Sequence, residues 1–575
     1  MQASRLVFAI SMVALVSGCA TQETQDVAST KGQPEAYAPP PAPTPPPNRV
    51  VVTGSRIQNG AARTALAPTQ GFVQADAAEA TAADPDSPSA MPGYRYFPPV
   101  FVATDPGREQ YDGEEVSPVR IATAEPVSTF SVDVDTGAYA NTRRFLTQGQ
   151  MPPRAAVRTE ELINYFRYDY ALPDSREMPF SVSTDMAVTP WNPETRLMRI
   201  GLRGYEMPED SRPPANLVFL LDVSGSMNSP DKLPLVRTAM RGLVNQLGKR
   251  DRVSIVVYAG AAGLVLDATS NPSEIKNAID DLRAGGSTAG GAGIELAYRV
   301  AEANRIDGGV NRVILATDGD FNVGVSDRDR LVELIEEKRE TGITLTTLGF
   351  GTGNYNEALM EQLANHGNGN YAYIDSALEA RKVLGEEMGA TLFTIAKDVK
   401  IQVEFNPAVV SQYRLIGYEN RALREEDFSN DAVDAGDIGA GHQVTAIYEI
   451  VPAGSTGWIE KRRYEDAVPQ TAFDKAEEAA FVKLRYKLPD GEKSRLVQSA
   501  IPASMLRDAR APKGDFAFAV AVAAFGQKLR DDKLMGEFDY DDIVRMSGGQ
   551  KDFYRQEFRK LVGVAEGMDA VRKGG

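Results

Sequence analysis

The sequence is poor in cysteine and histidine, with one Cys and two His among 575 residues. A single thiol, Cys19, excludes an intrachain disulfide and a multi-thiolate metal site. His366 and His442 are far apart in the sequence and have no cysteine partner, which argues against a zinc site and a catalytic triad. Beyond the N-terminus, no segment has the run of about 20 apolar residues that a membrane-spanning helix needs.

Positive charge is also scarce. The chain has 62 Lys and Arg against 79 Asp and Glu, a formal net charge of −17, and no Lys/Arg-rich run. A nucleic-acid partner requires a basic face, so we predict none. The segment Gly349–Gly353 lacks both the lysine of a phosphate-binding loop and the glycine spacing of a dinucleotide site. With no catalytic pair in evidence either, we predict that the protein is not an enzyme.

The N-terminus has the pattern of an export signal. An apolar run, Leu6–Val16, follows a short start with one positive charge and is too short to cross a bilayer. It ends in Val16-Ser17-Gly18-Cys19, which resembles a bacterial lipobox; an ordinary secretory signal is the alternative. The resemblance implies a signal peptide over residues 1–19, lipidation of Cys19, and outer-membrane location because Ala20 follows the cysteine. Whether the protein faces the periplasm or the exterior is left open.

Residues 20–125 have the composition of a tether. They include the proline-rich stretch Pro39–Pro47, which favours extended polyproline conformation over a packed core. Within them, Arg49–Ile57 resembles the segment before the plug of TonB-dependent outer-membrane receptors. This segment is either a docking peptide for a receptor or TonB-type partner, or a β-prone stretch without function.

Residues 213–395 alternate apolar strands with amphipathic helices, which predicts an α/β fold with a doubly wound, mainly parallel sheet. In such sheets ligands bind beyond the carboxyl ends of the strands. Asp222 and Asp318 occupy two of those ends. The predicted strands are 217–221, 253–258, 313–316 and 344–349.

Three segments of this region carry oxygen ligands: Asp222–Ser226, Gly285–Thr288 and Leu315–Gly319. They offer two carboxylates and three hydroxyls, a donor set that suits Mg²⁺, with Mn²⁺ or Ca²⁺ as alternatives. An EF-hand beginning at Asp318 is disfavoured, because Val323 stands where that loop needs glycine.

These segments resemble the metal-ion-dependent adhesion site of the von Willebrand factor type A domain, which has a Rossmann-like fold. The resemblance implies that Ser224 and Ser226 bind the metal directly, and that Thr288 binds directly or through water. It also implies that Asp222 and Asp318 act largely through waters. A protein ligand would complete the metal with an Asp or Glu carboxylate.

The flanking regions, residues 126–212 and 396–575, are β-rich, and the second ends in helices. Three of their segments resemble the N-terminal and C-terminal domains of bacterial von Willebrand factor type A lipoproteins: Phe130–Thr136, Glu160–Phe166 and Gly436–Ala446. We hypothesise that β segments from both flanks form one sandwich around the inserted α/β domain. A carboxylate pair at Asp133 and Asp135 is interpreted as exposed or capping.

The sequence therefore predicts an envelope lipoprotein that binds a protein through a Mg²⁺-dependent adhesion site. One alternative is a periplasmic assembly scaffold in which the metal is structural. A second is an accessory factor of an AAA+ chaperone or metal chelatase, which the export signal disfavours because those partners are cytosolic.

Overall fold

The structure is a computed structural model that describes residues 109–132, 134–174, 177–286, 290–319, 328–460 and 477–574. The predicted signal peptide, Cys19 and the segment 49–57 lie outside the described residues. Among the helices that are described, none combines the length and the apolar character needed to cross a membrane.

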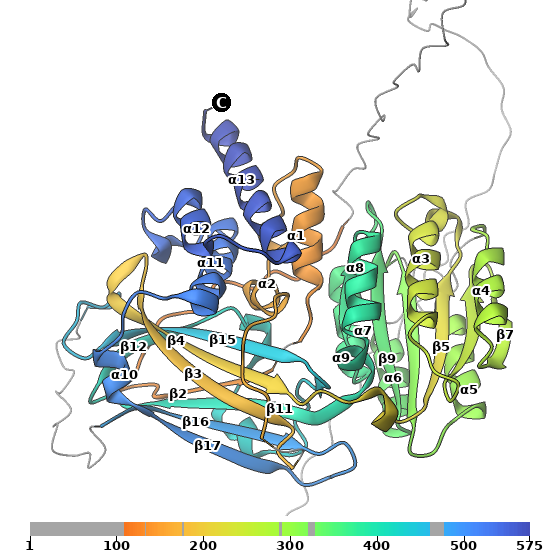
Figure 1. The fold of residues 1–575 in the computed structure, drawn as a ribbon, viewed down its shortest axis with the longest axis horizontal. Helices are drawn as coiled ribbons and strands as arrows, with labels where there is room; N and C mark the ends of the chain where they lie inside the picture. The colour runs from red at the N-terminus through yellow and green to blue at the C-terminus, as the bar shows by residue number, and fades with distance from the viewer. Residues whose placement is uncertain are drawn as a thin grey trace, which may run out of the picture. The chain divides into compact units, whose positions relative to one another are not determined.

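The central α/β module contains a six-stranded sheet with strand order β10-β9-β8-β5-β6-β7 (Figure 1). Every neighbouring pair is parallel except β6 with β7. This confirms the predicted mainly parallel sheet. The strands are β5 (Ala215–Asp222), β6 (Arg252–Tyr258), β7 (Ala262–Thr269), β8 (Val310–Thr317), β9 (Ile343–Phe350) and β10 (Tyr371–Ile374).

Strand β5 lies at the centre of this sheet and is buried at all eight positions. Leu217, Phe219 and Leu221 share one core with α3 (Leu233–Val244) and α4 (Pro272–Asp281). The alternate residues Val218 and Leu220 share a second core with the helices of the opposite face. A strand covered on both faces must be apolar throughout, which is why its sequence does not alternate. The helices of the opposite face are α5 (Gly290–Ala303), α6 (Arg328–Glu340) and α7 (Glu357–His366).

The helical segment that follows β10 is interrupted. Helix α8 (Ala377–Arg381) runs into a π-helical turn, η5 (Lys382–Glu386), and α9 (Met388–Leu392) follows. The chain then enters β11, so this broken segment is the exit from the α/β module.

Two antiparallel sheets combine strands from both sides of the central module, which confirms the single-sandwich hypothesis. N-terminal β4 pairs with C-terminal β15, and N-terminal β2 with C-terminal β11. The first sheet has the order β1 (Arg120–Ile121), β12 (Val410–Ile416), β15 (Gln443–Pro452), β4 (Asn192–Gly204) and β3 (Phe180–Thr189). The second has β13 (Ala422–Leu423), β2 (Val127–Ser131), β11 (Thr394–Phe405), β16 (Glu478–Lys487) and β17 (Arg495–Pro502), with β14 (Ile438–Gly439) on β11.

Aromatic side chains join the two sheets. The rings of Phe405 and Tyr413 stack with centroids 4.1 Å apart, and Phe180 meets Tyr486 edge to face at 4.9 Å. Each pair takes one residue from each sheet, so the inner faces share one core.

The outer face of the first sheet is covered by helices. Leu197, Ile416 and Ile447 from this face belong to the same core as these helices. Both faces of the sheet are thus buried, and β15 is buried over eight consecutive positions. The covering helices are α1 (Gly137–Thr147), α2 (Thr159–Asn164), α11 (Gly514–Leu529), α12 (Tyr540–Ser547) and α13 (Phe553–Gly574); the short α10 (Ala503–Arg507) follows β17.

The predicted end of the tether, residue 125, lies too far along the chain. Residues 120–121 form β1 on the edge of the first sheet, and Ala122 is fully buried. Gln110 bonds to the backbone of the α/β module. These residues contribute few apolar side chains, so composition alone did not separate them from the tether.

Candidate metal centre

Asp222 is the last residue of β5, and its carboxylate is fully buried. One oxygen accepts the backbone N–H of Ser224 at 2.8 Å, and the other accepts the hydroxyl of Thr317 at 2.9 Å. Burial, together with the nearby charge of Asp318, raises the pKa of Asp222 to about 6 against the lowering effect of these hydrogen bonds. The carboxylate is therefore held rigidly and gains from any added positive charge.

The hydroxyls of Ser224 and Ser226 lie side by side, with their oxygens 3.0 Å apart. Ser224 is buried, whereas Ser226 is exposed in the short helix η4 (Gly225–Asn228). The site thus has a buried side made of carboxylates and a side open to solvent.

Backbone hydrogen bonds draw the loops together. The N–H of Gly285 donates to the carbonyl of Val223 at 2.7 Å, and that of Gly225 donates to Gly286 at 3.0 Å. Gly286 has φ +88°, a conformation that side chains disfavour, so glycine is required for this close approach. Thr288, the remaining predicted ligand, lies outside the described residues.

Asp318 follows β8 and is fully buried. The backbone N–H of Gly319 donates to the hydroxyl of Thr317, which itself donates to Asp222. Thr317 therefore links the two acidic loops. The structure brings Asp222, Ser224, Ser226 and Asp318 to one edge of the sheet.

Lys232 was not predicted from the sequence as part of this site. Its ammonium donates to Asp318 at 2.9 Å and to the side-chain oxygen of Asn354 at 3.1 Å. The residue directly precedes α3, where a lysine by itself carries no signal of a partner. Asn354 directly follows the Gly349–Gly353 segment, so this loop lies at the rim of the candidate metal site.

The N-terminal end of the described chain is attached to this rim. The carboxylate of Glu109 accepts the backbone N–H of Gly353 at 3.0 Å and pairs with Arg144 of α1 at 2.8 Å. Glu109 therefore lies beside the loop that carries Asn354.

The other polar residues considered in the sequence have local roles. His366 contacts Glu336 at 2.7 Å, and His442 accepts the N–H of Gly439 at 3.1 Å. Burial lowers the pKa of His442 to about 4, so its imidazole is neutral. Asp135, interpreted as exposed or capping, is buried and accepts a hydrogen bond from the N–H of Tyr371. Asp133 lies outside the described residues.

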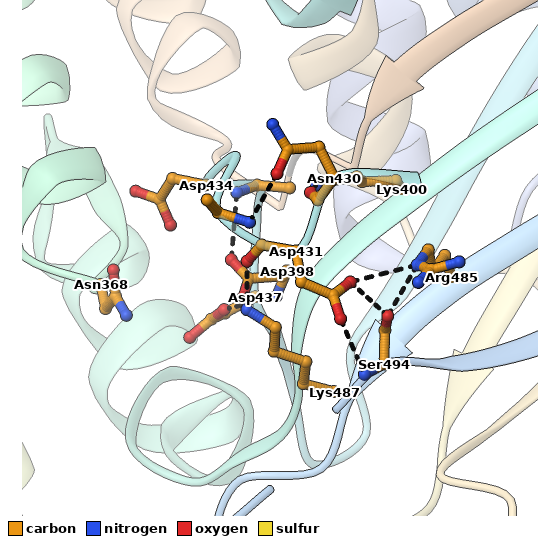
Figure 2. A network of polar contacts seen from close by, with 12 residues as sticks. Asn368, Asp398, Lys400, Asn430, Asp431, Asp434, Asp437, Arg485, Lys487 and Ser494 are labelled. Atoms are coloured by element: carbon orange, nitrogen blue, oxygen red, sulfur yellow. Dashed lines mark hydrogen bonds and ion pairs between the residues drawn. The ribbon is translucent and has the colours of Figure 1, made fainter. Parts of the chain in front are cut away.

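A second acidic cluster lies near the start of β11, where Figure 2 shows Asp398, Asp431, Asp434 and Asp437 close together. Lys487 pairs with Asp398 at 2.6 Å, Arg339 with Asp434 at 2.6 Å, and Arg485 with Asp431 at 3.2 Å. Arg339 belongs to α6, so its pair with Asp434 links the α/β module to the segment between β13 and β14, whereas the other two pairs lie within the sandwich region. Three of these four carboxylates are paired with the protein's own cations.

Asp437→Asn is expected to stabilise the protein at neutral pH. Burial, with the charges of Asp398 and Asp434, raises the pKa of Asp437 to about 7. A raised folded-state pKa means that stability is lost as pH rises from about 4 to about 7. Asn removes this loss, so the variant should gain ~1–2 kcal/mol at pH 8 and nothing below pH ~4. Denaturant unfolding at both pH values measures this, and a less stable variant at pH 8 would contradict it.

The donor set at Asp222–Ser226 fits a small divalent cation. The hydroxyls of Ser224 and Ser226 are hydrogen-bonded to each other at 3.0 Å, so both oxygens lie within reach of one small cation. Over the described residues, no group of three or more His, Cys, Asp or Glu is placed to hold a metal. A metal at this site would therefore depend on the hydroxyls as well as the carboxylates.

Three models of known protein families match this chain. Family models match residues 105–199 ("von Willebrand factor"), 216–386 ("von Willebrand factor type A domain") and 390–568 ("Uncharacterized protein YfbK, C-terminal"). The chain is 44% identical over 479 residues to the uncharacterized protein YfbK of Escherichia coli K12, covering 81% of this chain and 83% of that protein.

Other similarities are confined to parts of the chain. The uncharacterized protein sll0103 of Synechocystis is 33% identical over 187 residues, covering 32% of this chain and 43% of that protein. Among solved structures, proximal thread matrix protein 1 from the mussel byssus, with a zinc-occupied MIDAS motif, is 25% identical. That similarity covers 30% of this chain and 45% of the other, with a TM-score of 0.26.

Proposed function

Because the chain belongs to the family of bacterial von Willebrand factor type A proteins that includes YfbK of Escherichia coli, we propose that it is an envelope lipoprotein that captures a protein partner through Mg²⁺. Domains of this type are often metal-dependent protein-interaction modules. The observation that carries the proposal is the pair of serine hydroxyls, 3.0 Å apart, between buried carboxylates and solvent.

The donor chemistry supports Mg²⁺. In proteins Mg²⁺ is usually bound by one or two carboxylates and keeps several waters, which matches two buried carboxylates beside a side open to solvent. The two serine hydroxyls are hydrogen-bonded to each other at 3.0 Å, so both oxygens lie within reach of one small cation. Mn²⁺ shares the preference for oxygen ligands and is a suitable experimental substitute.

An outside carboxylate is the partner chemistry that the site favours. Asp222 and Ser224 occupy the buried side, so a further ligand would reach the metal from the side of the exposed Ser226. A bound divalent ion would supply positive charge there, and a partner's Asp or Glu matches it. The membrane anchor in this proposal rests on the sequence around Cys19 alone.

Ser224→Ala is expected to abolish Mg²⁺-dependent capture of the partner. Alanine removes one of the two adjacent hydroxyls but leaves the loop's backbone hydrogen bonds in place. The test is a pull-down from envelope membranes with Mg²⁺ or with EDTA, followed by identification of bands that require Mg²⁺. Ser273→Ala, at an exposed serine at the start of α4 in the same module, is the matched control and should retain capture.

Two outcomes would contradict the metal bridge. Capture that survives EDTA would show that the partner does not need the metal, and capture that survives Ser224→Ala would show that it does not need this site. Either result would favour the alternative of a scaffold whose flanking domains hold the partner.

A further inference from the structure

Lys232 places a positive charge inside the candidate metal centre. Its ammonium lies 2.9 Å from a carboxylate oxygen of Asp318, and both side chains are nearly inaccessible, at 8% and 0% exposure. Buried ion pairs differ from surface pairs because water cannot replace either partner. The ammonium is thus the cation that Asp318 meets when the centre holds no metal.

The surrounding structure fixes the position of this lysine. Gly351 has φ +75°, and a Cβ there would lie 2.3 Å from Cγ of Lys232. The carbonyl of Gly351 is held by the hydroxyl of Tyr373 at 2.7 Å, and the ammonium also donates to Asn354. Only glycine at 351 leaves room for the lysine stem.

The charge of the centre depends on Lys232. The carboxylates of Asp222 and Asp318 contribute two negative charges and Lys232 one positive charge, which leaves the metal-free centre with one net negative charge. A divalent cation would make the centre net positive by one, whereas without the lysine the loaded centre would be neutral. A net positive centre attracts an anionic ligand more strongly than a neutral carbonyl or hydroxyl.

We propose that Lys232 is an internal counter-cation of the metal centre: it competes with the metal for Asp318 and keeps the loaded centre positive. Metal binding by the protein alone is therefore weakened, and an anionic ligand strengthens it. Metal and carboxylate then bind cooperatively, so the centre is completed chiefly when its partner is present. This inference deepens the proposed function and rests on it.

The test is a titration of the purified full chain with Mn²⁺, followed by the EPR signal of free Mn²⁺, with and without acetate as the carboxylate probe. Lys232→Met should bind Mn²⁺ at least ~10-fold more tightly than the wild type, because one repelling charge is removed. Acetate should strengthen Mn²⁺ binding in the wild type and have less effect in the variant. Lys276→Met, which removes a partly exposed lysine of α4 in the same module, should match the wild type.

Two further variants keep the test decisive. Lys232→Gln is neutral and can still hydrogen-bond to Asp318 and Asn354, so it replaces Lys232→Met if that variant does not fold. Lys232→Arg keeps the charge and should bind Mn²⁺ like the wild type. An unchanged or weaker Mn²⁺ affinity in a folded neutral variant overturns the role of Lys232.

The outcomes separate this inference from the proposed function. Binding by the wild type with no difference in the neutral variants rejects only the inference. Binding by neither the wild type nor the neutral variants rejects both. Binding by a neutral variant alone would support the competition by Lys232 and contradict metal-dependent capture by the native chain.

Discussion

Asp222→Asn is expected to abolish the stabilisation of the protein by Mg²⁺ while leaving the metal-free protein at least as stable as the wild type. These two effects have opposite signs because the carboxylate is costly without a metal and necessary with one. Burial raises the pKa of Asp222 to about 6, which means that the charged form is disfavoured in the folded state.

A raised folded-state pKa means that stability is lost as pH rises through about 6, so at pH 7 and above Asn should recover up to ~2 kcal/mol. In the wild type, Mg²⁺ at 100 times its Kd should add about 2.7 kcal/mol. In the variant the lost charge should weaken metal affinity at least ~100-fold and remove this gain.

Thermal unfolding in EDTA and in saturating Mg²⁺ measures both quantities. Asp267→Asn, at an exposed aspartate on β7 of the same module, is the matched control and should keep the Mg²⁺ response. An increase of Tm with Mg²⁺ in Asp222→Asn equal to that of the wild type would place the metal elsewhere.

Arg143→Met is expected to destabilise the protein by ~3–5 kcal/mol, the cost of leaving buried carboxylates without their cation. The guanidinium of Arg143 on α1 pairs with Asp375 at 2.6 Å and with Glu379 at 2.7 Å, both in the α/β module. It also pairs with Glu557 of α13 at 2.9 Å. Glu379 is 1% exposed, and burial raises its pKa against the opposing charge of Arg143.

Denaturant unfolding followed by circular dichroism measures this loss, with the first transition compared because the chain has more than one module. Arg381→Met is the control: this arginine lies on α8 in the same region, but it is 74% exposed and pairs only loosely with Glu386. Its loss should cost under ~0.5 kcal/mol. Equal effects of the two substitutions would show that the buried network contributes little.

The sequence predicted the central strands well because their signal is local. Each of β5, β6, β8 and β9 is buried on both faces, so the strand appears as a short apolar run between amphipathic helices. The edge strands β7 and β10 were missed for the opposite reason. β7 is half-exposed along its length, and β10 has only four residues.

Long-range pairing was harder to predict. Local pattern indicated β strands on both flanks, but it contains no information on which strands become neighbours. Phe130 of β2 is paired with Ile401 of β11, and the whole α/β module lies between them in the sequence. Such pairings are decided by the shared core and not by any local preference.

The sequence by itself indicated the candidate ligands, because Asp222, Ser224 and Ser226 are close in the chain and Asp318 follows a recognisable strand. Only the tertiary structure decided the electrostatics of that site. Lys232, Asn354 and Glu109 come from separate segments that meet at the same edge of the sheet. A charge acts through space over a few ångströms, whatever its separation along the chain, so the cation beside Asp318 could be found only once the chain was folded.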